Sequence, residues 1–238
     1  MSESSIDTNS ITSAADATSI VEDDNNNNNN NNNDTGHEFE HMICDKSPIF
    51  LSFQNLTVET VSYFNPKSIS KTLLNNVSGN ITGGLCAVMG SSGSGKTTFL
   101  SALALRIDPF RMKVAGLLYM NGSEYNKHAL KSMSCYVMQD DLVHPNFKVS
   151  EVLSFAAELR MSRTIGAAER IERVTYVMKL MGINHCRDVI VGDTRNKGIS
   201  GGERKRLCIA MELLSKPSLL FLDEPTSGKI MLHFTQLL

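Results

Sequence analysis

The chain has 238 residues, 41% of them hydrophobic and 20% charged, and its net charge of −2 divides into an acidic segment, residues 1–45, and a remainder of +8. No stretch approaches the roughly 18 continuous apolar residues of a membrane-spanning helix, and the acidic N-terminus excludes a secretory signal or an Arg-rich transit peptide. Five dispersed cysteines without a CxxC pair favour reduced thiols over a disulfide framework or a zinc site, so we expect a soluble intracellular protein.

Residues 1–46 are predicted to be a disordered tail that precedes one folded domain, residues 47–238. The tail is rich in Ser, Thr, Asp and Asn and includes nine consecutive asparagines, residues 25–33. Such a segment buries too little apolar surface to offset the entropy cost of ordering it. The alternative, an aggregation-prone asparagine tract, is the less favoured interpretation.

Five short apolar segments are predicted to be strands. In chain order they are residues 49–58, 84–89, 117–120, 134–138 and 219–222. The first alternates between apolar and polar residues, whereas the second is a continuous apolar run that meets Gly90. The third is followed by Asn121-Gly122, a dipeptide typical of a tight turn.

Three later segments carry apolar residues at the i, i+3, i+4, i+7 spacing of a helical face. The three faces consist of Val152, Phe155, Ala156 and Leu159; of Ile171, Val174, Met178 and Met181; and of Leu207, Ala210, Met211 and Leu214. Ser150 is predicted to cap the first of these helices. Helices mixed with strands in this way predict an α/β domain with a largely parallel central sheet.

The most specific motif lies between the apolar run 84–89 and a short helix predicted from residue 98 to about residue 105. It fits G-x-x-x-x-G-K-[ST] and consists of Gly90, Ser91, Ser92, Gly93, Ser94, Gly95, Lys96, Thr97 and Thr98. Glycines let successive backbone N–H groups face an anion, and the helix N-terminus adds its positive dipole end. Lys96 is placed to reach the β- and γ-phosphates of a nucleotide, and the Thr97 hydroxyl to ligate Mg²⁺. An ordinary Gly/Ser-rich turn is the less favoured interpretation.

The apolar strand at 219–222 ends in two carboxylates, Asp223 and Glu224. A buried carboxylate is costly unless a cation or hydrogen bonds hold it. Asp223 is therefore predicted to hold a metal beside the phosphate loop, and Glu224 to polarise a water for attack on the γ-phosphate. Alone, the pattern also fits an ordinary strand end. The phosphate loop in the same chain favours the metal-site interpretation.

A third motif opens the last predicted helix. Ser200 and Glu203 have the spacing of a capping box, and Gly201 and Gly202 leave backbone N–H groups uncovered at the helix start. One interpretation is a second anion site formed by Ser200, Gly201 and Gly202. The other is an ordinary capped helix with a solvated basic face at residues 204–206, and spacing alone does not decide between them.

These motifs together resemble the ATP-binding cassette (ABC) transporter family. The similar segments are residues 90–98 (Walker A), 136–141 (the Q-loop region), 200–203 (the signature motif) and 219–224 (Walker B). Residues 138–141, 201–206 and 223–228 look more narrowly like the G subfamily, the White-type half-transporters. The resemblance spans about residues 49–228, with four motifs in the order of the family.

The resemblance implies a P-loop NTPase fold with a helical signature subdomain, and two cassettes that pair head to tail around ATP and Mg²⁺. In this chain Lys96 and Thr97 would hold phosphate and Mg²⁺, and Asp223 would support the metal. Gln139 would touch the Mg²⁺ or the attacking water, and Glu224 would be the general base of ATP hydrolysis.

The same resemblance implies that Ser200 and Gly202 contact the γ-phosphate of ATP bound to the partner cassette. Tyr63 or Phe64 either stacks on adenine or belongs to ordinary packing. The implied partner is a second cassette, identical or different, through which the chain would reach a transmembrane domain at the cytosolic face of a membrane. Intact relatives export lipids or other amphiphiles, and no nucleic acid is expected.

After Gly228 the chain departs from the family pattern. Similar proteins continue with Leu-Asp, the D-loop, but here Lys229 follows, and His233 comes too early for the switch histidine. We therefore expect an incomplete cassette, with residues 229–238 outside the pattern and impaired turnover. The alternative is a non-hydrolysing ATP-binding module that pairs with full-length half-transporters. A soluble cassette acting on ribosomes or nucleic acid is disfavoured, because the basic residues are dispersed.

Overall fold

The computed structural model describes residues 49–61, 69–138, 143–193 and 196–224. They fall into two compact units, the first reaching to Ser134 and the second beginning at Cys135, and each unit is described by itself. The predicted tail, residues 1–46, lies outside the described residues, and so do residues 229–238 with their departure from the family pattern.

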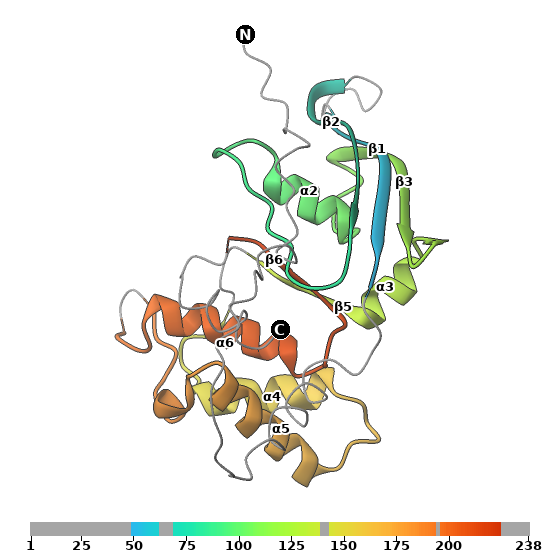
Figure 1. The fold of residues 1–238 in the computed structure, drawn as a ribbon. Coiled ribbons are helices and arrows are strands. Elements are labelled where there is room, and N and C mark those ends of the chain that lie inside the picture. Colours follow the sequence, from blue (N-terminus) through green and yellow to red (C-terminus); the bar gives the residue numbers. More distant parts are fainter. Residues whose placement is uncertain (1–48, 62–68, 139–142, 194–195, 225–238) are drawn as a thin grey trace, which may run out of the picture. The chain divides into compact units, whose positions relative to one another are not determined.

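The first unit is built on a four-stranded sheet in the order β2-β1-β3-β4 (Figure 1). Its strands are β1 (Leu51–Val61), β2 (Ile69–Ile81), β3 (Met112–Met120) and β4 (Ser123–Glu124), and its helices are α2 (Lys96–Leu103) and α3 (Lys127–Met133). All three strand pairings are antiparallel. One face of β1 is buried, and Phe53 on it meets Phe99 of α2 edge to face, with ring centroids 5.2 Å apart. This contact fixes the helix that begins in the phosphate loop against its own sheet.

The turn between β3 and β4 confirms the prediction from Asn121-Gly122. Both residues have positive φ, 52° and 79°, as a two-residue hairpin turn whose twist matches its strands requires. Asn121 adds a tie to β1, because its side-chain oxygen accepts a hydrogen bond from the Phe50 backbone N–H at 2.9 Å.

The predicted strand over residues 84–89 is not formed: Cys86 alone makes a β-bridge there. A strand needs a hydrogen-bonding neighbour along its length, and an apolar run does not reveal whether one exists. Conversely, β2 was not predicted. Its Asn- and Ser-rich sequence has little alternation, and Leu74 and Val77 are the described side chains that it buries.

The second unit packs three helices beside a two-stranded sheet. Its elements are β5 (Ser134–Val137), α4 (Val149–Arg160), α5 (Ala167–Leu180), the 3₁₀ helix η3 (Asn184–Cys186), α6 (Gly201–Leu213) and β6 (Leu219–Leu222). β5 pairs with β6 although α4, α5 and α6 lie between them in the chain. Both units thus combine helices and strands, which confirms the predicted α/β class, while the larger described sheet is antiparallel.

The helix faces differ in part from those predicted. α4 begins at Val149 with Lys148, not Ser150, at its N-cap. Phe155, Leu159 and Ile171 are exposed, although the spacing placed them on buried faces. The other residues of the three predicted faces lie in the core of the unit or pack against it, and this core also includes Leu153, Ala157 and Val177 from the adjacent stripes. Spacing identified the helices correctly, but a three-helix core selects which neighbouring stripe of each helix is covered.

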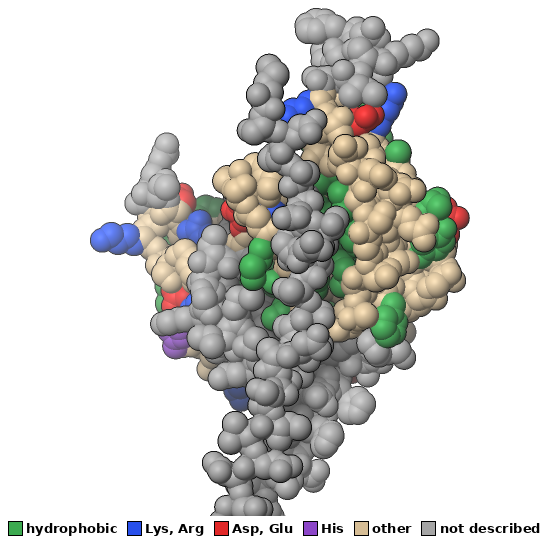
Figure 2. All heavy atoms as spheres, turned by 45° about the horizontal axis from the view of Figure 1, so that its top comes forward, with side chains coloured by type: hydrophobic (Ala, Val, Ile, Leu, Met, Phe, Trp, Pro, Cys, Tyr) green, Lys and Arg blue, Asp and Glu red, His purple; other side chains and the backbone are tan. Residues whose placement is uncertain are grey.

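Exposed apolar side chains occur on both units as separate groups. On the face drawn in Figure 2, hydrophobic side chains form several small patches among polar side chains and backbone. The largest exposure among the described large apolar residues is that of Phe110, at 92%. None of the helices in the described part of the chain has the length and apolar character that a membrane crossing requires.

Candidate functional site

The predicted phosphate loop, residues 90–98, ends in α2, which begins at Lys96, two residues earlier than predicted. Gly93 and Gly95 have φ of 80° and 96°, left-handed values that a side chain would oppose. Since Gly95 is the N-cap, the backbone N–H groups of the first turn have no partner within the helix and point outward from its start. The loop therefore presents donors and the positive end of the helix dipole at one place.

Lys96 folds back over this loop. Its Nζ donates hydrogen bonds to the carbonyl oxygens of Gly90 and Ser91, at 3.0 and 2.9 Å. The Ser94 N–H donates to the Ser91 carbonyl at 3.2 Å, which closes the turn between them. An ammonium group that donates to neutral carbonyls still favours an anion at the same place.

Ser94 supplies the test of whether a phosphate fits. Its side-chain oxygen is buried and has no hydrogen-bond partner among the residues that the structure describes. A Cβ on Gly90 would lie 2.6 Å from that oxygen, so Gly90 keeps the space around the hydroxyl open. An unpaired buried hydroxyl costs about 1–3 kcal/mol, which a phosphate oxygen would recover by accepting its hydrogen bond. The loop residues thus fit a phosphate group.

Asp223 lies just beyond β6 and is 4% exposed. The Tyr136 hydroxyl donates to its Oδ2 at 3.1 Å, and its backbone N–H donates to the Val137 carbonyl, also at 3.1 Å. A buried carboxylate with oxygen lone pairs at a strand end is suited to a hard cation such as Mg²⁺. Sequence reasoning assigned Tyr136 no role, because a tyrosine inside a strand gives no signal of the carboxylate beside it.

Glu224 follows in a different environment. It is exposed and has a φ of 49°, a left-handed backbone that is uncommon outside glycine. This conformation turns the chain sharply after the buried Asp223. The two adjacent carboxylates therefore differ in burial, which suits one for holding a cation and the other for meeting water.

The third motif forms the capped helix start that the spacing predicted. The Ser200 N–H donates to Glu203 Oε2 at 2.7 Å, the Ser200 Oγ donates to the same oxygen at 2.7 Å, and the Glu203 N–H donates to Ser200 Oγ at 3.3 Å. These bonds from Ser200, with a further one from His185, lower the pKa of Glu203 to about 2. Gly201 is exposed, and a Cβ on it would meet nothing within 4 Å.

The basic residues after the cap are not a solvated face. Lys205 is 4% exposed, and its Nζ donates to the Met138 carbonyl at 2.6 Å. Arg204 donates to the carbonyls of Val191 and Gly192 at 3.3 and 2.7 Å. The predicted solvated basic face at residues 204–206 is therefore wrong. These side chains instead connect α6 to the end of β5 and to the loop before the helix.

The predicted site residues divide between the two units. Residues 90–98 belong to the first, whereas Ser200–Gly202, Asp223 and Glu224 belong to the second. Within the second unit, Lys205 joins the signature helix to Met138, the residue before Gln139. Gln139 itself lies outside the described residues, as do Tyr63, Phe64 and His233.

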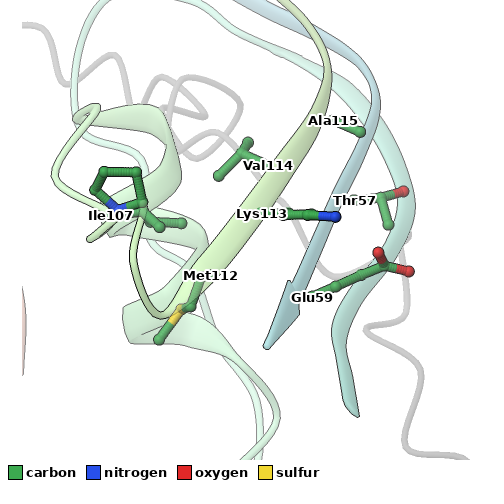
Figure 3. Close-up of a pocket in the computed structure, with 8 residues that line it drawn as sticks. Thr57, Glu59, Ile107, Met112, Lys113, Val114 and Ala115 are labelled. Atoms are coloured by element: carbon green, nitrogen blue, oxygen red, sulfur yellow. The ribbon is translucent and has the colours of Figure 1, made fainter. Parts of the chain in front are cut away.

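A separate hollow of about 490 Å³ lies in the first unit between β1, β3 and the connection before β3 (Figure 3). Ile107, Met112 and Val114 give it an apolar lining beside Glu59 and Lys113. None of the predicted site residues lines it. Its single carboxylate and single amine provide no set of converging groups, so we assign it no role.

Comparison with known proteins agrees with the motifs. Residues 74–227 match the family described as ABC transporter. The chain is 42% identical over 188 residues to ABC transporter G family member 1 of Dictyostelium discoideum, covering 77% of this chain and 23% of that protein. It is 42% identical over 182 residues to ABC transporter G family member 22 of Arabidopsis thaliana, covering 76% and 24%. The chain spans about a quarter of the length of these curated relatives.

Proposed function

The chain belongs to the ABC transporter family, and from that membership we propose that it is the ATP-binding cassette of a G-type transporter, which binds Mg-ATP through residues 90–98. The observation that carries the proposal is the phosphate loop, which combines the ammonium group of Lys96, the first residue of α2, with the buried Ser94 hydroxyl, for which the described residues provide no hydrogen-bond partner. When a phosphate enters, the Ser94 hydroxyl gains a partner and the Lys96 ammonium group exchanges neutral carbonyls for charged oxygens.

Different groups of the loop contact different parts of the triphosphate. Lys96 leaves the carbonyls of Gly90 and Ser91 for the β- and γ-phosphates, because a charge-assisted bond to phosphate is stronger than one to a neutral carbonyl. Ser94 donates to a phosphate oxygen, as do the backbone N–H groups at the start of α2. These contacts position the nucleotide and require no movement of the helix, whose Phe99 is fixed in the core.

The metal ligands we propose are Thr97, Gln139 and Asp223. Bound Mg²⁺ supplies charge neutralisation of the β- and γ-phosphates. Asp223 is buried and held by the Tyr136 hydroxyl, so its orientation is set before any ligand arrives. Glu224, exposed next to it, is the proposed general base that takes the proton of the attacking water.

The proposed partner is a second cassette, identical or different. Ser200, Gly201 and Gly202 lie at an exposed or half-exposed helix start, where the Gly201 and Gly202 N–H groups face no preceding turn of α6 and can donate to a γ-phosphate held by that partner. Through the paired cassettes the chain would power transport of a lipid-like or amphiphilic substrate at the cytosolic face of a membrane.

The experiment is a titration of the purified full chain with a fluorescent ATP analogue and Mg²⁺, beside Lys96→Ala and Lys127→Ala. Lys127 is the matched control because it is also the first residue of a helix in the first unit. Loss of a charge-assisted contact worth about 1.5–3 kcal/mol should weaken binding roughly 10- to 100-fold in Lys96→Ala and leave Lys127→Ala unchanged. Equal affinity in all three proteins would refute the proposed site.

Turnover is tested separately with Glu224→Gln. Hydrolysis in the wild-type chain that this variant abolishes, with ATP binding retained, would assign Glu224 as the base. ATP binding without hydrolysis in the wild-type chain would instead support the non-hydrolysing module that pairs with full-length half-transporters.

A further inference from the structure

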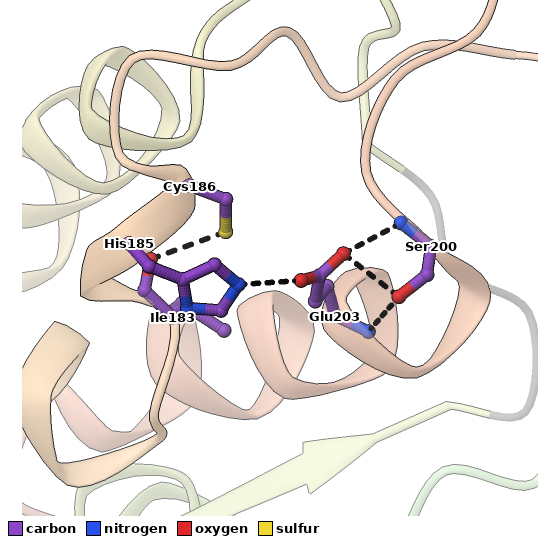
Figure 4. A network of polar contacts seen from close by, with 5 residues as sticks. All are labelled: Ile183, His185, Cys186, Ser200 and Glu203. Atoms are coloured by element: carbon purple, nitrogen blue, oxygen red, sulfur yellow. Dashed lines mark hydrogen bonds and ion pairs between the residues drawn. The ribbon is translucent and has the colours of Figure 1, made fainter.

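Three side chains of types that can ligate a metal, and that the nucleotide site does not use, converge beside the start of α6. They are His185 and Cys186 on η3 and Glu203 on α6, and one ligand atom of each lies within 4.8 Å of the other two. Figure 4 shows the His185 ring and the Glu203 carboxylate pointing at each other, with the Cys186 sulfur beside them. His185 Nε2 and Glu203 Oε1 are 2.7 Å apart.

The mixture of nitrogen, sulfur and oxygen donors selects a class of metal. A thiolate and an imidazole suit Zn²⁺ and similar transition metals, whereas Mg²⁺ and Ca²⁺ take oxygen ligands. Ligand atoms about 2.0–2.3 Å from a tetrahedral Zn²⁺ lie roughly 3.5 Å from one another. The three atoms here are close enough to reach that arrangement through small side-chain movements.

The surroundings orient these ligands. Glu203 accepts both Ser200 hydrogen bonds on Oε2, so Oε1 is left to face the histidine and a metal. The Cys186 thiol is buried and donates to the Ile183 carbonyl at 3.1 Å, which holds the sulfur in place. The His185 side chain is 64% exposed and leaves a solvent side for a fourth ligand, water. Outer contacts of this kind fix ligand geometry in metal sites.

We propose that His185, Cys186 and Glu203 form a binding site for a divalent transition metal of the Zn²⁺ type, which joins η3 to the start of α6. On binding, the Cys186 S–H proton passes to solvent and the thiolate electron pair forms the bond to the metal, with no change of oxidation state. Burial raises the pKa of this thiol, so the metal must compete with a proton. The sequence favoured reduced, unliganded cysteines because the five cysteines are dispersed and form no CxxC pair.

The test uses the full chain without a histidine tag and Co²⁺ as a spectroscopic probe. We expect one equivalent of Co²⁺ to give a near-ultraviolet thiolate-to-cobalt charge-transfer band, and Zn²⁺ but not Mg²⁺ to remove it. Zn²⁺ affinity is then measured by competition with a coloured chelator. Neither readout involves ATP, so a failure here leaves the nucleotide site untouched.

Variants assign the ligands. Cys186→Ser should abolish the band, and His185→Ala should weaken Zn²⁺ binding by more than the roughly 10- to 100-fold that loss of an outer contact costs. Cys208→Ser, a half-buried cysteine on the same α6, is the matched control and should keep both properties. Because His185 is exposed, His185→Ala should fold even if the buried cysteine tolerates no change. No one-to-one band, or binding unaffected by His185→Ala, would overturn the proposal.

Discussion

Lys96 and Lys205 both donate to backbone carbonyls, but they differ in burial and therefore in role. Lys96 is half-buried at the start of α2 and bonds to its own loop, so an incoming phosphate can take the amine away. Lys205 is almost fully buried and holds the Met138 carbonyl, a bond between two elements distant in the chain. The sequence predicted the first from its motif, but it gave the second no more weight than its two arginine neighbours, because burial is a property of the fold.

Glu203→Gln tests the capped start of α6 through its pH dependence. The pKa of Glu203 is about 2 in the folded chain against an ordinary 4.5, so its ionised form stabilises the fold above pH 4.5 and this stabilisation is lost as the pH falls toward 2. Gln can still accept from Ser200, so the variant isolates the charge. We expect it to lower the free energy of unfolding by about 1–2 kcal/mol at pH 7, a value discounted for solvent screening.

The measurement is urea unfolding of the full chain with a chelator present, at pH 7 and at pH 3. Glu169→Gln is the matched control, since Glu169 also lies in the first turn of a helix but makes no cap. The difference between Glu203→Gln and wild type should shrink at pH 3. A loss of stability that is the same at both pH values would show that the carboxylate charge contributes nothing.

At the scale of elements, the β3–β4 hairpin depends on its turn. Gly122 has a φ of 79°, and a Cβ there would meet nothing within 4 Å, so the cost of a side chain comes from the backbone alone. A left-handed backbone costs an L-residue roughly 1–2 kcal/mol. Gly122→Ala should therefore lower the free energy of unfolding by about 1 kcal/mol, measured by urea unfolding.

Gly201→Ala is the control for that change. A Cβ on Gly201 would also meet nothing within 4 Å. Gly201 is, however, the first residue of α6 and has helical geometry, in which Ala is favoured over Gly. Its stability should stay the same or rise. If both variants lost the same stability, the positive φ of the turn would not be the cause.

Element prediction succeeded where the signal was local and failed where it depended on a neighbour. The Asn121-Gly122 turn and the capped start at Ser200 follow from side chains within four residues, and both are confirmed. Residues 84–89 have the composition of a strand but make one bridge only, while β2 is a strand because β1 pairs along it. The local periodicity of a segment does not reveal which distant segment it pairs with.

For the whole molecule, the order of motifs predicted the family before any contact was known, and the match over residues 74–227 confirms it. The same order says nothing of how the motifs divide: the phosphate loop belongs to one compact unit, and the signature helix and Asp223 to the other. The sequence did not reveal which side chains support each motif. The structure shows, for example, that the Tyr136 hydroxyl donates to Asp223.

The proposed head-to-tail pairing makes a prediction that concerns two molecules. Lys96→Ala removes the phosphate contact of one half-site and Ser200→Arg blocks the other, so neither variant alone should dimerise with ATP. In a mixture, one composite site combines the intact residues 90–98 of one chain with the intact Ser200 of the other. Size-exclusion chromatography with light scattering should therefore show an ATP-dependent dimer in the mixture of the two variants but in neither variant alone. If the mixture behaved as the sum of its components, residues 90–98 and Ser200 would not act across two chains.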